Sequence, residues 1–114
     1  PSDDPEFMNF ALADCEVGLS LIDVHDVIIK DLTFRHFRLD GVNAHDRCRE
    51  VLLDNVTCEQ NGRAGIAVAG SSRILVMNSR LAANRKASLL ITELGQAALD
   101  ACDLDAEPTI VDNE

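Results

Sequence analysis

Residues 41–44 read Gly-Val-Asn-Ala and residues 65–68 read Gly-Ile-Ala-Val, and this short pattern decides the fold. An earlier copy is Gly-Leu-Ser-Leu at 18–21, and Ser-Leu-Leu-Ile at 88–91 continues the series. The copies begin at positions 18, 41, 65 and 88, so they are spaced by 23, 24 and 23 residues. A fixed period of this length indicates a solenoid, in which each repeat stacks on the next.

A second apolar run follows each glycine motif, and it reads Val-Ile-Ile at 27–29, Val-Leu-Leu at 51–53, Ile-Leu-Val at 74–76 and Ala-Ala-Leu at 97–99. Inward and outward side chains alternate along these segments, as they do in β-strands. A unit with two or three short strands cannot bury its own apolar face, so neighbouring units must stack. The sequence therefore predicts an all-β fold, a single-stranded parallel β-helix of four to five coils of about 23 residues.

Two further positions recur in every unit. Two residues after each apolar run stands a residue of a turn column, whose polar members are Asp31, Asn55 and Asn78. A side-chain amide both donates and accepts, so we expect this column to form a structural ladder from coil to coil. Three residues later an apolar side chain recurs, and we expect it to point inward: Phe34, Cys58, Leu81 and Leu104.

The length of 114 residues allows one domain, and its composition suits a narrow core. The chain has no Trp, no Tyr and four Phe, so its interior must consist of thin aliphatic layers. We predict that residues 1–8 are a tail or a vector remnant and that residues 9–114 form the solenoid, with Asn9 and Leu12 in a partial first coil. Because open terminal coils expose strand edges, we expect either a fragment of a longer solenoid or self-association through the ends.

Charge and cysteine usage exclude some functions and leave others open. Twenty acidic and ten basic residues give a net charge of −10, which disfavours binding to nucleic acids. No apolar run approaches the roughly 18–20 residues that a membrane-spanning helix requires. The cysteines (Cys15, Cys48, Cys58 and Cys102) form no Cys-x-x-Cys pair, and we expect buried thiols, with a disulfide as the alternative.

These repeats resemble the right-handed parallel β-helix superfamily, which includes pectate lyases and other polysaccharide-active proteins. The resemblance covers roughly residues 9–111 and is clearest over residues 51–66. That family stacks turn asparagines in a ladder, which matches the predicted column of Asp31, Asn55 and Asn78. The resemblance implies a polysaccharide-related role and favours an extracellular or periplasmic location.

Residues 40–46, Asp-Gly-Val-Asn-Ala-His-Asp, are similar to the Asp-Pro-His segment of mannuronan epimerases and alginate lyases. The resemblance implies that His45 is the base that removes the proton next to a uronate carboxylate, and that Asp46 takes the acidic position after it. Asn43 and Ala44 stand where the family has Asp and Pro, and the family's Tyr has no counterpart. The candidate catalytic residues are therefore His45 and Asp46, and the candidate substrate-binding residues are Asn43, Arg47, Arg49 and Asp23.

Two functional hypotheses follow. In the first, the module binds or modifies an acidic, uronate-containing polysaccharide on its outer face; the chain alone is expected to be inactive, and any reaction would be of the lyase or epimerase type. In the second, it is a noncatalytic structural module that self-assembles. No cofactor is expected. A calcium site in the column Asp23, Asp46 and Glu93 is a weaker alternative to a solvated acidic edge, since Gly70 interrupts the carboxylates.

Overall fold

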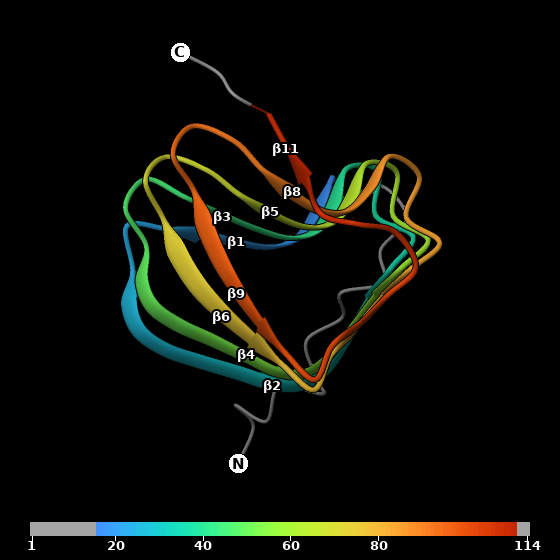
Figure 1. The fold of residues 1–114 in the computed structure, drawn as a ribbon, viewed down its shortest axis with the longest axis horizontal. Helices are drawn as coiled ribbons and strands as arrows, with labels where there is room; N and C mark the ends of the chain where they lie inside the picture. The colour runs from blue at the N-terminus through green and yellow to red at the C-terminus, as the bar shows by residue number, and fades with distance from the viewer. Residues whose placement is uncertain (1–15, 112–114) are drawn as a thin grey trace.

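A computed structural model describes residues 16–111, which form strands and turns throughout. The first sheet contains β1 (Val17–Ile22), β3 (Asp40–His45), β5 (Ala64–Val68), β8 (Ala87–Ile91) and β11 (Thr109–Ile110). The second contains β2 (His25–Arg35), β4 (Arg49–Glu59), β6 (Arg73–Met77), β7 (Arg80–Ala82), β9 (Gln96–Asp100) and β10 (Asp103–Leu104). Every strand pair is parallel, and the chain winds through about four turns of a solenoid (Figure 1). The predicted fold class is confirmed.

The cross-section has three faces because the second sheet bends (Figure 1). The first half of β4 pairs with β6 and its last part pairs with β7, so one long strand serves two faces. We call the first sheet face A, the β6 side face B and the β7 side face C. The turns between them form three corners: corner AB (residues 23–24, 46–48, 69–72 and 92–95), corner BC (31, 55, 78 and 101) and corner CA (36–39, 60–63, 83–86 and 105–108).

The register follows the sequence period. Val42 pairs with Ile66, and Ile66 pairs with Leu89, so each residue stacks on its equivalent one coil away. The predicted inward column is confirmed for Phe34, Cys58 and Leu81, which are fully buried, while Leu104 in the last coil is half-buried. Burial of each such side chain contributes about 1.5–3 kcal/mol, and stacking of aliphatic layers is therefore the main source of stability.

Corner BC explains the polar column that the sequence predicted. Asp31, Asn55, Asn78 and Ala101 all have positive φ, between 53° and 62°. Asn and Asp tolerate this left-handed backbone better than other residues with a side chain, so the turn itself favours them. Their side chains are exposed.

The predicted ladder is only partly formed. Asn55 donates from Nδ2 to Oδ1 of Asp31 at 2.8 Å, but Asn78 donates to Oδ1 of Asp54 at 3.0 Å and not to Asn55. A carboxylate is a stronger acceptor than an amide oxygen, and Asp54 offers one beside the corner. The interpretation of Asp31, Asn55 and Asn78 as one continuous ladder is therefore corrected to two separate exposed contacts.

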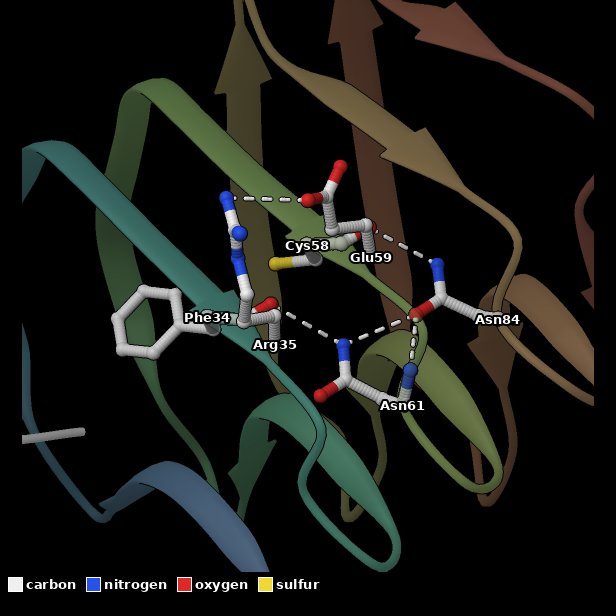
Figure 2. A network of polar contacts seen from close by, with 6 residues as sticks. All are labelled: Phe34, Arg35, Cys58, Glu59, Asn61 and Asn84. Carbon is white, nitrogen blue, oxygen red and sulfur yellow. Dashed lines mark hydrogen bonds and ion pairs between the residues drawn. The ribbon is translucent and has the colours of Figure 1, made fainter. Parts of the chain in front are cut away.

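A buried asparagine ladder stands instead at corner CA (Figure 2). Asn61 donates from Nδ2 to Oδ1 of Asn84 at 2.9 Å and to the carbonyl of Phe34 at 3.2 Å, and its Oδ1 accepts from the Phe37 amide at 3.0 Å. Asn84 in turn donates to the carbonyl of Cys58 at 2.9 Å. The two amides thereby satisfy backbone groups that the turn would leave unpaired inside the protein.

The described cysteines are free thiols. Cys48 and Cys58 are buried and Cys102 is half-buried, while Cys15 lies outside the described residues, as do Asn9 and Leu12 of the expected partial coil. Burial raises the pKa of the Cys58 thiol well above its ordinary value, so this thiol is protonated and unreactive. Within residues 16–111 no helix is long and apolar enough to cross a membrane.

The two kinds of asparagine differ in their predicted contribution to stability. Asn61→Ala removes the hydrogen bonds of this side chain to the Phe37 amide, to the Phe34 carbonyl and to Asn84 inside the protein, so we expect a loss of about 2–4 kcal/mol in the free energy of unfolding. Asn55→Gly removes an exposed bond and keeps a residue that accepts positive φ, so we expect a loss below about 1 kcal/mol. Urea denaturation of both variants measures the difference, and equal losses would contradict a buried structural ladder at Asn61.

Candidate functional site

His45 ends β3 and lies on the outer side of face A. Its partner in the preceding coil is Ile22, and Ala69 follows the strand in the next coil. The His45 side chain is 36% exposed, and its Nδ1 lies 3.5 Å from Oδ2 of Asp46. This pair can orient the imidazole, but its strand neighbours are apolar and provide no second group for proton transfer.

Asn43 has a structural partner. Its Nδ2 donates to Oδ2 of Asp40 at 2.8 Å, and Arg63 donates to both oxygens of the same carboxylate, at 2.9 and 2.6 Å. Asp40 is fully buried, and this carboxylate also raises the pKa of the Arg63 guanidinium. A buried carboxylate requires such partners, so the amide of Asn43 helps to hold Asp40. Its role in substrate binding stays a prediction.

The other candidate residues lie around corner AB. Asp23, Asp46 and Glu93 share positive φ values of 52°, 63° and 50°, and Gly70 in the same column has 61°. The acidic column is therefore a series of left-handed turns, which Asp tolerates. Among residues 16–111, no three His, Cys, Asp or Glu side chains converge in a way that could hold a metal ion.

Arg47 lies in corner AB, whereas Arg49 lies beyond this corner on face B. Arg47 is exposed, and its backbone amide donates to the carbonyl of Gly70 at 2.8 Å. Arg49 begins β4 on face B, and its guanidinium donates to the carbonyl of Ser71 in the next coil. The structure therefore groups Arg49 with the next coil rather than with His45.

A hollow of about 630 Å³ lies beside Arg49 and is lined also by Ser71, Arg73, Gln96 and residues 94–95. Arg73 pairs with Gln96 across β6 and β9, so three consecutive coils contribute one long polar side chain each. We call this the arginine hollow. Sequence reasoning missed Arg73 and Gln96. Both directly precede the second apolar run of their coils, at the position that Glu50 holds in an earlier coil, so the repeat could have located them.

A comparison with protein families agrees with the parallel solenoid that the structure shows. The family model described as a right handed beta helix region matches residues 2–114. The chain belongs to this right-handed β-helix family. No curated protein and no solved structure gives a significant match to this β-helix.

The arginine hollow of this β-helix has an acidic edge. Glu50 precedes Arg73 by one coil, and Asp26 stands in the coil before that. A hydrogen bond with Asp26 and repulsion by its charge raise the pKa of the Glu50 carboxyl. Hydrogen bonds with Glu50 and His25 lower the pKa of Asp26, and the contact of His25 Nδ1 with Asp26 Oδ2 at 3.0 Å raises the pKa of His25.

The signs of these shifts give a testable prediction. Glu50 and His25, with raised pKa values, contribute stability that is present at low pH and is lost as the pH rises through their folded values. Asp26 contributes stability that is lost as the pH falls through its own lowered value. We expect Asp26→Asn to lower the pKa values of both Glu50 and His25 toward their ordinary values, as NMR titration of the carboxyl carbon and the imidazole protons will show.

Asp103→Asn, on face C, is the matched control and should leave both pKa values unchanged. If the pKa of Glu50 stays the same in Asp26→Asn, the interaction between the two carboxylates is refuted.

Proposed function

We propose that this β-helix binds a uronate-containing polysaccharide at the arginine hollow, without changing it chemically. The observation that carries the proposal is the position of Arg49 and Arg73 in consecutive coils, with Gln96 in the coil that follows. Adjacent parallel strands lie about 4.8 Å apart, so paired Arg73 and Gln96 present polar groups at this spacing along the axis, and Arg49 adds a cation one residue before the equivalent position in the preceding coil. A polymer with a carboxylate on each sugar offers a matching series of acceptors.

The chemistry of the hollow favours an acidic sugar over a neutral one. A guanidinium donates two parallel hydrogen bonds to a carboxylate, which adds both energy and orientation. Neutral sugars depend more on stacking against aromatic rings, and the chain has no Trp or Tyr to supply it. Recognition at this corner therefore has to come from charge and from amides such as that of Gln96.

In this proposal His45 helps to orient the bound polymer and does not complete a catalytic mechanism. Proton abstraction next to a carboxylate needs a base and also a group that returns a proton. His45 with Asp46 resembles the first, but Ile22 and Ala69 flank it where the second would stand. Binding therefore explains the arrangement better than catalysis does, with His45 and Arg47 at the outer edge of the polymer's path.

The test is a titration of the whole chain with a short galacturonate oligomer, followed by NMR. We expect saturable shifts of the Arg49 and Arg73 side-chain signals, with smaller shifts at His45 and Arg47. Because a charge-assisted hydrogen bond contributes about 1.5–3 kcal/mol, Arg49→Gln or Arg73→Gln should weaken binding by roughly tenfold or more. Lys30→Gln, which removes a cation elsewhere on face B, should not change it.

A neutral galactose oligomer of the same length is the ligand control and should not bind. Unchanged spectra of the unmodified protein at millimolar galacturonate oligomer would rule the proposal out.

A second candidate function is assembly of copies end to end, and the last described coil favours it. Leu94 is 81% exposed and Ile110 is 71% exposed. A hollow of about 440 Å³ opens there beside Cys102 and Leu104, which pack against the apolar core, and beside exposed Leu99, which pairs with buried Val76 of the preceding coil. Strands β9, β10 and β11 each end their sheet path and have a partner on one side only within the described residues. A coil of a second copy has the same strand spacing and fits such an edge.

Sedimentation velocity over a wide range of concentrations tests this assembly. We expect association that increases with concentration and that Leu99→Lys weakens, because a charge would enter the apolar layer. Lys30→Gln again serves as the control. If the unmodified chain sediments as a monomer at every concentration, assembly is refuted. This result would not affect the proposal of polysaccharide binding at the arginine hollow.

A further inference from the structure

Corner CA contains a shallow notch that none of the functions above uses. It has a volume of about 470 Å³ and lies between Arg38 in one coil and Arg85 two coils later, with Gln60 and Gly62 in the coil between them. The Gly62 amide donates to the Phe37 carbonyl at 2.8 Å, and the Arg85 amide donates to the Asn61 carbonyl at 2.9 Å. The matching bonds show that Arg38, Gly62 and Arg85 occupy equivalent positions in three successive coils.

Gly62 keeps the space between the two arginines open. A Cβ atom at this position would lie 1.9 Å from the carbonyl oxygen of Arg38, so no side chain fits here without moving the backbone. Two strand spacings separate the Cα atoms of Arg38 and Arg85 by about 10 Å along the axis. Two long guanidinium side chains can close on one small ligand across such a gap.

The charges around the notch leave these two arginines available. Three carboxylates have other partners: Glu59 pairs with Arg35 at 3.1 Å, Asp40 pairs with Arg63, and Asp105 accepts from the Ala83 amide at 2.7 Å and from Ser88 at 2.8 Å. Glu107, in the last described coil of this corner, is exposed. Within the described part of the chain, neither Arg38 nor Arg85 forms an ion pair with a carboxylate.

Lys86 adds a further exposed cation beside Arg85. On a protein with a net charge of −10, this corner is a local exception that attracts anions instead of repelling them.

The floor of the notch is rigid. Asn61 is 1% exposed and lines the notch, and its side chain bonds to Asn84 and to the Phe34 carbonyl (Figure 2). Its Oδ1 also accepts from the Phe37 amide. These bonds fix the backbone from which Arg38 and Arg85 extend. Binding to a fixed frame costs less conformational entropy than binding that must first order a loop.

We propose that the notch is an anion site that binds one oxyanion group, a sulfate, phosphate or carboxylate, between the guanidinium groups of Arg38 and Arg85. The fork of each guanidinium matches two oxygens of such a group. The amide of Gln60 at the rim can donate a further hydrogen bond. The site lies at another corner from the arginine hollow, so it does not depend on polysaccharide binding there.

Sodium sulfate is the first probe, added to the whole chain at constant ionic strength with chloride as the balancing anion. We expect saturable shifts of the Arg38 and Arg85 Nε–H signals and of the Gly62 amide. Arg38→Gln and Arg85→Gln should each weaken sulfate binding at least tenfold, and Arg38→Lys should fall between, since it keeps the charge but loses the fork. Circular dichroism of each variant verifies that the fold is retained.

Arg73→Gln is the matched control from the arginine hollow and should leave sulfate binding at the notch unchanged. Sulfate shifts of equal size at Arg38, Arg47 and Arg73, or shifts at Gly62 that persist in the double variant Arg38→Gln/Arg85→Gln, would overturn the site.

A second arm identifies the source of the anion. A sulfated oligosaccharide that binds at the notch more than tenfold tighter than sulfate supports a group carried on a polymer. Binding no tighter than that of sulfate supports a free ion as the ligand. Loss of sulfate binding in the Arg38 and Arg85 variants, with galacturonate binding intact, separates the two sites from each other.

Discussion

The coil-to-coil register is the constraint on which the rest of the structure depends. Parallel pairing places every residue over its equivalent 23 or 24 positions later, so one misplaced residue would shift a whole column. The left-handed residues at corners AB and BC keep this register, because each turns the chain at the same point in every coil. Inside this frame the aliphatic side chains pack in layers, and outside it polar groups stand in columns. Both the core and the candidate sites follow from the same stacking.

The polar surface is uneven around the solenoid, and the two proposed binding sites differ in their surroundings. On face B next to corner AB, Arg49, Arg73 and Gln96 stand beside the carboxylates of Asp26 and Glu50, so positive and negative groups lie in adjoining coils. At corner CA, Asp105 accepts hydrogen bonds from Ala83 and Ser88, and within the described residues Arg38 and Arg85 form no ion pair. Neighbouring carboxylates therefore offset the positive charge less at corner CA than at the arginine hollow, although the protein as a whole is acidic.

Sequence reasoning was strongest where a property repeats and weakest where it depends on contacts between coils. The period, the parallel fold and the inward column of Phe34, Cys58 and Leu81 could be predicted, because hydrophobic spacing carries them directly. The turn column was located correctly, but its hydrogen bonds were not, since the choice of Asp54 as the partner of Asn78 depends on side-chain geometry. The structural partner of Asn43, the buried Asp40 that Arg63 also binds from the next coil, could not be predicted because it depends on burial and on contacts between coils. The substrate-binding role of Asn43 remains a prediction. The roles of His45, Asp46, Arg47, Arg49 and Asp23 remain predictions.

Phe37 gives the solenoid a direction. It occupies the position that Asn61 and Asn84 hold in the next two coils, because its amide bonds to the Asn61 side chain as the Asn61 amide bonds to that of Asn84. Its own side chain is apolar and buried, so it closes the asparagine ladder at that end. The coils are consequently not interchangeable modules. Duplication of the coil around Asn61 would lengthen the ladder by one rung. Duplication of the coil around Phe37 would set one aromatic ring over another and leave the first Phe37 amide without the side-chain acceptor that Asn61 provides.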